Sequence, residues 1–485
     1  MPALARPPRT IETTLPPRRA LVAAEAEVLV VGGGPAGIGA ALGAAAAGAD
    51  VILAERYAFL GGNATAALVM PLMSFHTQRA EFETRGEPKL FPTDHGPGEP
   101  VVAGALSLLL QRLVQTGGAI APSRETGYVV PFDPELFKLA ALELLDEAGV
   151  RFLFHAFASG VTEDDGVRGV VFETKSGPLV IRARVVIDCT GDGDIAAQAG
   201  ADYEVGRERD GLAQPMTLMF RMVDFEQEAF ARYVRTHPDQ WRGVHGLWDL
   251  IREAAEAGEL DLPREDILFF GTPHPREVSV NSTRVTHVLG TDVFDWSYAE
   301  WQARAQLRQI ADFLRRRVPG FEAAYIAQSG VHTGVRETRR VVGDYQLTVA
   351  DVLGARKFED VIARGSYPVD IHNPTGVGTV LKRLPPGEAY DIPLRCLLPR
   401  GIDGLLVAGR CLSGTHEAHS SYRVMPIVMA TGQAAGVCAA LATRAGSPTR
   451  AVPVERVQDE LIAQGADLRD VRPSAHLKGQ RHARG

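Results

Sequence analysis

Three closely spaced glycines carry the clearest chemical signal in the sequence. Gly32, Gly34 and Gly37 form a Gly-x-Gly-x-x-Gly motif between a β-branched run and a segment of small residues. This pattern predicts a tight turn at the first glycine, a pyrophosphate at the second and close helix–strand packing at the third. Free N–H groups at the start of the helix favour an anion there. Glu55 ends the next apolar run, about 20 residues on, and is expected to bind ribose hydroxyls.

Three further segments favour contacts with a second nucleotide unit. Leu60–Thr65 (LGGNAT) has a Gly-Gly pair and a threonine, which can contact a nucleotide through backbone and hydroxyl. Ile187–Asp194 (IDCTGDGD) contains a strand that ends at Thr190 and Gly191, where the backbone can approach a cofactor. Leu405–Arg410 (LLVAGR) precedes a second small-residue helix and is expected to close over the same cofactor.

One of these segments repeats the glycine spacing without predicting a second dinucleotide site. The repeat runs through Gly191, Gly193 and Ala196. Asp192 and Asp194 lie inside it and would repel a pyrophosphate at close range. The segment is therefore expected to serve the first cofactor only.

Residues 415–423 (THEAHSSYR) bring acid–base and anion-binding side chains together just before the late helix. His416 and His419 can act as general acid or base beside a cofactor. The alternative is that these residues only stabilise a loop.

The arginines of the segment RETRR can bind an anionic or polyhydroxylated substrate through forked hydrogen bonds. They are Arg336, Arg339 and Arg340, with Tyr345 close by. Salt bridges to Glu337 or Asp344 are an equally open alternative. His372, beside Asp370, and His76 are further candidates for acid–base chemistry.

The order of elements predicts an α/β fold. Glu27–Val31 and Val51–Glu55 are expected to be buried strands on either side of a helix at 36–47, the β-α-β unit of a parallel sheet. Further strands are expected at 151–155, 169–173, 179–183, 185–188 and 405–408, and helices at 134–148, 226–236, 296–317 and 424–442.

The length of 485 residues favours two domains. We expect a Rossmann-like binding domain that is interrupted by a second, α+β substrate domain. The expected division is a flexible arm at 1–24, a first part at 25–205 with an insertion at 76–130, the inserted domain at 206–394, a last part at 395–468 and a disordered tail at 469–485.

Composition limits the partners. A net charge of -8 argues against nucleic acid. No stretch approaches the roughly 20 consecutive apolar residues of a membrane span, and no apolar run follows the N-terminal arginines as in a signal peptide. The four cysteines form no C-x-x-C pair, so we expect buried thiols, no metal site and a cytoplasmic protein. No pattern indicates an oligomeric state.

Several stretches together resemble one family. They are VLVVGGGPAG, ERYAFLGGNAT, VVIDCTGDGDIAAQAGADYEVGRE, RETRRVVGDYQLT, SYPVDIH and LLVAGRCLSGTHEAHSSYRVMPIVMATGQAAG. They are similar to the FAD-dependent oxidoreductase family, which has a glutathione-reductase-type FAD fold and is distantly related to fumarate reductase flavoproteins. With the motifs above, the resemblance implies a bound FAD near Gly32, Gly34, Pro35, Ala36, Gly37, Glu55, Arg56, Gly61, Gly62, Asn63, Thr65, Thr190, Gly191, Gly409, Arg410 and Met425.

Departures from related families refine this expectation. Relatives that attach flavin covalently have a histidine shortly after the second strand, but Gly61–Thr65 has none, which implies non-covalent FAD. The dithiol pair and NAD(P) domain of glutathione-reductase relatives have no counterpart here. His419 and Arg423 have the spacing of a carboxylate-binding pair in fumarate reductases, and His416 is the rival alignment.

The resemblance leaves the reaction open. We expect hydride transfer between a small polar substrate with a CH–OH or CH–NH centre and FAD, with a histidine taking the proton. Reduction of an activated C=C bond is one alternative. An electron-transfer flavoprotein without its own substrate is another, although the sequence lacks the cysteine cluster of an iron–sulfur partner site. The acidic balance disfavours the tRNA-binding role of a related FAD fold.

Overall fold

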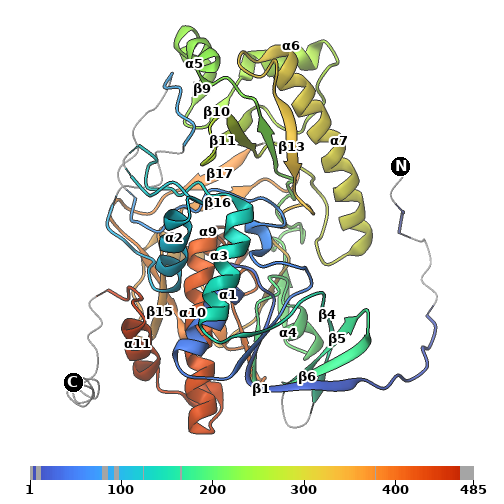
Figure 1. Cartoon of the computed structure of the whole chain (residues 1–485), viewed down its shortest axis with the longest axis vertical. Helices are drawn as coiled ribbons and strands as arrows, with labels where there is room; N and C mark the ends of the chain where they lie inside the picture. Colours follow the sequence, from blue (N-terminus) through green and yellow to red (C-terminus); the bar gives the residue numbers. More distant parts are fainter. Residues whose placement is uncertain are drawn as a thin grey trace.

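The computed structural model describes residues 4–6, 12–78, 86–91, 98–123, 125–163, 167–376 and 378–469. These residues form two packed parts. Figure 1 shows the first part, with β1, α1 and α10, in the lower half of the view. The second part, with α5, α6 and α7, lies in the upper half.

A seven-stranded sheet forms the centre of the first part. Strands β3, β2, β1, β6 and β19 run parallel in this order, and β5 and β4 add an antiparallel edge to the first half of β6. The bounds are β1 (Leu21–Val31), β2 (Val51–Ala54), β3 (Arg151–Leu153), β4 (Phe157–Glu163), β5 (Val167–Thr174), β6 (Gly177–Asp188) and β19 (Leu405–Val407). The predicted α/β class and parallel sheet are confirmed.

Both faces of this sheet are covered. Successive side chains of β1 point to opposite faces, so Val28 and Val30 enter one core while Leu29 and Val31 enter the other. The first core contains α1 (Pro35–Ala46), α2 (Ala105–Gln115), α3 (Pro134–Glu147), α10 (Met425–Ala445) and α11 (Val454–Ala463). The other core contains the short helix α4 (Asp194–Gln198).

Helices α1 and α10 pack closely because glycines remove the side chains between them. A Cβ on Gly39 would lie 2.1 Å from the carbonyl oxygen of Met429, and a Cβ on Gly432 would lie 1.9 Å from that of Ala36. Among the described residues, α10 is the one helix long and apolar enough to cross a membrane by length and composition. In this fold 89% of its apolar window is buried inside the protein.

An antiparallel six-stranded sheet, in the order β13-β8-β12-β11-β10-β9, forms the second part. Its strands are β8 (Phe220–Val223), β9 (Trp241–Arg242), β10 (His245–Gly246), β11 (Ile267–Gly271), β12 (Glu277–Val280) and β13 (Tyr325–Ser329). Helices α5 (Gln227–Thr236), α6 (Trp248–Glu256) and α7 (Val293–Arg317) cover it. Its core is aromatic, with Phe230, Trp241 and Phe269 in mutual ring contact.

Short elements complete the structure. Three strand pairs join β7 (Tyr203–Val205) to β14 (Arg339–Val341), β15 (Val361–Gly365) to β18 (Tyr390–Pro393), and β16 (Val369–His372) to β17 (Thr379–Lys382). The helices are α8 (Val349–Leu353) and α9 (His416–Tyr422), with 3₁₀ turns at Gly62–Ala64, Pro238–Gln240, Leu394–Leu397 and Thr449–Ala451.

Two strand predictions need correction. β1 begins at Leu21, so residues 21–24 of the predicted arm lie in the sheet. They pair with β6 through backbone hydrogen bonds while Leu21 and Val22 stay exposed, and backbone pairing of this kind leaves no apolar pattern in the sequence. The strands predicted at 179–183 and 185–188 form the single strand β6. The helices predicted at 134–148 and 424–442 are confirmed as α3 and α10.

The cores divide the chain differently from the predicted domain boundaries. The second core is built from residues 216–335 (apart from Leu90), whereas buried residues between 347 and 398 belong to the first core. The predicted insertion at 76–130 contains α2, whose Leu106, Leu109 and Leu113 are buried in the first core. Residues 79–85 and 92–97 of this insertion, and the predicted tail from 470, lie outside the described residues.

Candidate active site

The glycine-rich turn has the geometry that its sequence predicts. Gly32 has φ +102°, and a Cβ there would lie 2.5 Å from the carbonyl oxygen of Cys189. A Cβ on Gly37 would lie 1.8 Å from the carbonyl oxygen of Gly32. Gly34 caps α1, and its Cα faces the Gly61-Gly62 loop. The turn therefore leaves the start of α1 open to an anion.

Glu55 is fixed in the orientation needed to bind a ribose. Its Oε2 accepts a hydrogen bond from the N–H of Gly33 at 2.6 Å, and its Oε1 accepts one from Tyr57 at 2.9 Å. The residue is 5% exposed and lines the cleft described next. Each carboxylate oxygen can accept a second hydrogen bond, so the side chain can hold both ribose hydroxyls.

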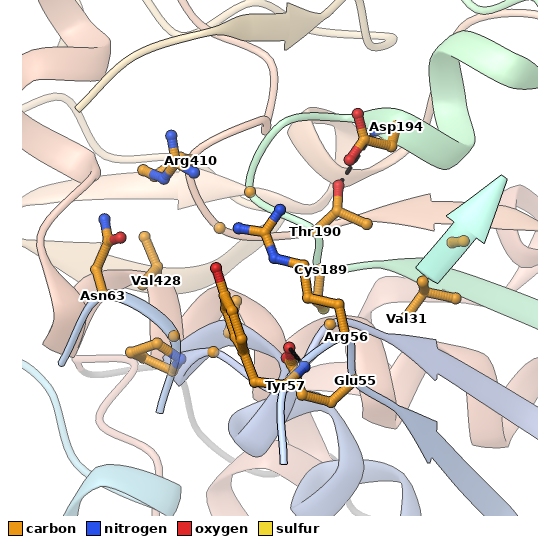
Figure 2. Close-up of a pocket in the computed structure, with 18 of the residues that line it drawn as sticks. Val31, Glu55, Arg56, Tyr57, Asn63, Cys189, Thr190, Asp194, Arg410 and Val428 are labelled. Carbon is orange, nitrogen blue, oxygen red and sulfur yellow. Dashed lines mark hydrogen bonds between the residues drawn. The ribbon is translucent and has the colours of Figure 1, made fainter. Parts of the chain in front are cut away.

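A cleft with about 940 Å³ of empty space lies at the carboxyl edge of the parallel sheet. Figure 2 shows Glu55, Arg56 and Tyr57 on one side of it and Arg410 across from them. Most residues predicted to bind the cofactor line this cleft: Gly32, Gly34, Pro35, Ala36, Glu55, Arg56, Gly62, Asn63, Thr190, Gly191, Gly409, Arg410 and Met425. Gly37, Gly61 and Thr65 do not line it.

Thr65 shapes the loop instead of facing the cleft. Its hydroxyl donates to the carbonyl oxygen of Leu60 at 2.7 Å, and the side chain is buried. A Cβ on Gly61 would strike this side chain. The N–H of Gly61 in turn donates to the carbonyl oxygen of Gly33 at 2.8 Å, so the loop is held against the glycine-rich turn. The predicted hydroxyl contact with the cofactor is therefore corrected to a contact within the loop.

The acidic residues after β6 are paired or buried. Asp192 accepts a hydrogen bond from Arg410 at 3.0 Å, and Asp194 accepts one from Arg339 at 2.9 Å. Burial, together with the charges of Asp192 and Asp188, raises the pKa of Asp194 to about 6. Because these groups are neutralised by arginines, they do not prevent an anion from binding at the opposite end of the cleft.

Two arginines in the cleft retain donors for a ligand. Nη1 of Arg410 and Nε of Arg423 are buried and have no hydrogen-bond partner among the described residues. Met425, the first residue of α10, lines the cleft next to them, so the N-terminus of that helix faces it. Buried unpaired donors are costly, and an anionic or carbonyl-rich cofactor would satisfy them.

Sequence reasoning missed the aromatic side of the cleft. The Tyr57 ring lies parallel to the His332 ring, with centroids 5.6 Å apart, and the Arg56 guanidinium lies 4.9 Å from the Tyr57 centroid. Burial lowers the pKa of His332 to about 4, so this ring is neutral. His332 comes from the second part of the chain, and no local motif marks it. Because the N–H of Tyr57 donates to Glu55, the Tyr57–His332 stack lies at the adenosine end of the predicted cofactor.

A second cavity, with about 1950 Å³ of empty space, adjoins the cleft. Asn63, Arg410, Arg423 and Met425 line both spaces. Its remaining wall comes from the second sheet, from β16 and β17, and from the segment after the Gly-Gly loop. The second cavity therefore lies between the two parts of the chain and opens onto the cofactor cleft.

Three of the predicted catalytic residues line the second cavity: Arg336, His372 and Arg423. Nη1 of Arg336 donates to the carbonyl oxygen of Pro215 at 2.7 Å. His372 has Nδ1 at 3.2 Å from Nη2 of Arg284 and Nε2 at 3.5 Å from Asp370. Burial lowers the pKa of His372 to about 4.

His416 and His419, predicted as catalytic residues, line neither of these two cavities. Thr415 caps α9, and His416 at its start turns Nδ1 toward Glu337 at 2.8 Å. His419 is fully buried, and its ring meets Tyr422 edge to face. Burial holds the pKa of His419 well below its usual value. The helix directs both rings into the protein interior.

Of the other two arginines of RETRR, Arg340 forms a salt bridge that was the alternative, and Arg339 forms one with a partner that was not predicted. Arg340 pairs with Glu337, and Arg339 pairs with Asp194. Tyr345 donates to Asp351 at 2.9 Å. The predicted partner Asp344 instead pairs with Arg450.

The structure also places His76 and the four cysteines. His76 lines neither cavity, and burial lowers its pKa. The four cysteines, Cys189, Cys396, Cys411 and Cys438, are free and buried, as predicted.

A histidine–aspartate pair in the second cavity was also missed. Nδ1 of His245 lies 2.8 Å from Asp266, which Arg264 contacts at 2.9 Å. Burial alone would raise the pKa of Asp266, but the His245 hydrogen bond and the Arg264 charge outweigh it and lower the pKa. The carboxylate thus accepts a hydrogen bond from Nδ1–H, and no described residue hydrogen-bonds Nε2. The two residues are 21 apart in sequence, with His245 at the start of β10 and Asp266 just before β11, so no sequence spacing reveals them.

The parallel sheet and its glycine-rich turn place the protein in the Rossmann-like class of dinucleotide-binding proteins. Residues 27–461 match the sequence model of the family described as FAD dependent oxidoreductase. The chain belongs to this family, and its dinucleotide is FAD. The cleft fits FAD, because Glu55, the turn and the unpaired arginine donors supply partners for ribose, pyrophosphate and flavin oxygens. No curated protein matches the chain in sequence.

Similar solved structures share only the fold. A geranylgeranyl bacteriochlorophyll reductase-like protein from Thermoplasma acidophilum is 14% identical over 91% of this chain and 87% of that chain, with a TM-score of 0.42. The p-nitrophenol 4-monooxygenase PnpA from Pseudomonas putida is 11% identical over 95% and 93%, with a TM-score of 0.43. The flavin-dependent brominase Bmp2 is 12% identical over 91% and 84%, with a TM-score of 0.42. Likeness of this degree carries no information on the reaction.

Proposed function

We propose that the protein dehydrogenates a CH–OH or CH–NH centre of a substrate bound in the second cavity, with FAD as the electron acceptor. The observation that carries this proposal is the wall shared by cavity and cleft, made of Asn63, Arg410, Arg423 and Met425. A substrate in the second cavity can meet the cofactor away from bulk water. An electron carrier without its own substrate would have no use for so large a cavity.

The proposed reaction requires a base. FAD, when bound, accepts two electrons together with a hydrogen from the substrate carbon. The O–H or N–H proton must leave as the C=O or C=N bond forms. Nε2 of His245 takes this proton, because Asp266 binds Nδ1 and thereby fixes the tautomer with a free Nε2 lone pair. The same carboxylate stabilises the imidazolium that results.

His372 is a poor base in this arrangement. An arginine only donates hydrogen bonds, so Arg284 occupies the Nδ1 lone pair of His372, and the remaining proton on Nε2 faces Asp370. Taking up a second proton would place a cation against Arg284. The role of His372 is then to position Asp370 and Arg284.

Helix α10 supports the same reaction electrostatically. A helix N-terminus carries the equivalent of about half a positive charge, concentrated in its first turn. The first turn of α10 begins at Met425, with Arg423 just ahead of it, and both residues line the cleft. This positive potential stabilises the negative charge that reaches the cofactor with the electrons.

The test is an anaerobic screen of the FAD-loaded protein. Alcohols, amines, hydroxy acids and amino acids are added one at a time, and the visible flavin absorbance is followed. We expect at least one class to bleach the flavin and to give a product that has lost two hydrogens. A protein that no such compound reduces, or one whose product has gained an oxygen atom, would exclude dehydrogenation.

A further inference from the structure

We infer that the second cavity binds an organic acid, whose carboxylate lies between Arg336 and Arg423 and whose apolar body contacts the apolar side chains that line the cavity. This inference rests on the proposed function and names the substrate class for the same cavity. It departs from the small polar substrate that the sequence suggests.

The first observation is an arginine without a counter-ion. Arg336 lines the second cavity, and its described partners are neutral, namely the carbonyl oxygen of Pro215 and the hydroxyl of Thr217, both bound through Nη1. No described residue hydrogen-bonds its Nε or Nη2. Burial, with the charges of Arg423 and Arg284, lowers the pKa of Arg336 to about 9. A cation in this position gains most from an anion that binds in the cavity.

The second observation is a local excess of positive charge. Among the described residues, the cluster around Arg336 contains the guanidinium groups of Arg264, Arg284, Arg336 and Arg423, against two carboxylates, Asp266 and Asp370. Asp266 pairs with Arg264, and Asp370 lies 3.6 Å from Arg423. Arg410 is balanced separately by Asp192. Two positive charges of the cluster are thus left without a carboxylate, and an anionic substrate would supply one.

The third observation is the position of the proposed carboxylate site between Arg336 and Arg423. Arg423 lines the cofactor cleft as well as the second cavity, and its Nε is buried without a partner. A carboxylate held by Arg336 and Arg423 therefore lies where the cavity meets the cleft. The carbon next to the carboxylate is then the part of the substrate closest to the cofactor, as in a 2-hydroxy or 2-amino acid.

The fourth observation is the apolar part of the cavity lining. It is formed by Met70, Met73, Met219, Val244, Leu268 and Phe270. The volume within the cavity that a ligand can occupy is about 450 Å³, inside the range of about 300–1,000 Å³ that is usual for small-molecule sites. Each CH₂ group that these side chains bury is expected to tighten binding by roughly fourfold. The cavity therefore favours acids with a sizeable hydrocarbon part.

The proposed oxidation needs only FAD as the electron acceptor and His245 as the base. The C–H bond next to the carboxylate breaks, and its hydrogen leaves with the electron pair to FAD, which is reduced. The O–H or N–H bond also breaks, and its proton goes to Nε2 of His245. A C=O or C=N bond forms, so the acid is oxidised by two electrons to a 2-oxo or 2-imino acid.

The experiment measures binding without turnover. The FAD-loaded protein is titrated with pyruvate, 2-oxooctanoate and the amide of 2-oxooctanoate, and the perturbation of the visible flavin spectrum gives each dissociation constant. We expect 2-oxooctanoate to bind at least roughly tenfold more tightly than either pyruvate or the amide. An amide that binds as tightly as the acid, or affinities that do not depend on chain length, would overturn the inference.

Two variants test whether Arg336 and Arg423 bind the carboxylate. Arg336→Gln is expected to weaken 2-oxooctanoate binding by roughly tenfold or more while the amide is little affected. Arg423→Gln serves as the second variant if the first does not fold. The matched control is Arg317→Gln. Arg317 ends α7 and pairs with Glu259, outside the cavity lining, so this variant should bind the acid and the amide as the wild type does. If the wild type and both cavity variants bind the acid equally tightly, the carboxylate does not bind between Arg336 and Arg423.

The outcome also separates this inference from the proposed function. If neutral alcohols or amines bleach the flavin and acids do not bind, the dehydrogenase proposal stands and the substrate class is wrong. If acids bind as predicted and no compound bleaches the flavin, the anion site stands and the dehydrogenase proposal fails.

Discussion

Replacing His245 by alanine is expected to slow the reduction of FAD by substrate by roughly 10²- to 10⁴-fold, the range of lost general-base catalysis. The cofactor should remain bound, because His245 lines the second cavity and not the cleft. Asp266→Asn should also slow reduction, since an amide can no longer fix the Nδ1–H tautomer. Rapid mixing of the oxidised protein with substrate under anaerobic conditions measures these rates.

Two further histidine variants serve as comparisons for His245→Ala. His237→Ala, at an exposed histidine that stacks on Tyr233, should reduce at the wild-type rate. His372→Ala should have a smaller effect than His245→Ala, because Arg284 already occupies the lone pair of His372. If His245→Ala reduces FAD as fast as the wild type while His372→Ala does not, His372, one of the acid–base candidates from the sequence, is the base instead of His245.

Loss of the Glu55 carboxylate is expected to weaken FAD binding by roughly 10- to 100-fold or more, since a hydrogen bond to a charged group contributes about 1.5–3 kcal/mol. Glu55→Ala also leaves the N–H groups of Gly33 and Tyr57 without their partner. The measurement is a titration of the apoprotein with FAD, followed by flavin fluorescence. The apoprotein is accessible because we expect non-covalent FAD, which acid or heat releases into the supernatant.

A matched glutamate controls for general effects on stability. Glu143, exposed on α3 and paired with Arg112, belongs to the same part of the chain. Glu143→Ala should bind FAD like the wild type. An unchanged FAD affinity in Glu55→Ala would remove Glu55 from the site, and flavin that stays with the precipitated polypeptide would contradict non-covalent binding.

The cofactor side of the protein could be predicted from sequence because its determinants are local. Gly32, Gly37 and Glu55 lie within one β-α-β unit, where chain geometry fixes their relative positions. Thr65 shows the limit of that reasoning, since a hydroxyl near a cofactor loop can equally serve the backbone of its own loop. The sequence cannot distinguish these two partners.

The substrate side could be predicted only in part because it is assembled from distant segments. His245 on β10 meets Asp266 just before β11, and His332 reaches the cofactor cleft from the second part of the chain. His416 and His419 have promising neighbours in sequence, but α9 turns them inward toward Glu337 and Tyr422. Local spacing gives residue types, whereas tertiary packing decides which of them face a cavity.

The most direct test of the account uses a 2-hydroxy or 2-amino acid from the bleaching screen with deuterium on the carbon next to the carboxylate. The rate of anaerobic FAD reduction is compared for the labelled and unlabelled acids. If that carbon gives its hydrogen to FAD, the labelled acid should reduce the flavin several-fold more slowly and yield the 2-oxo or 2-imino acid. Equal rates for the two acids, with the deuterium still on that carbon in the product, would contradict the proposed dehydrogenation.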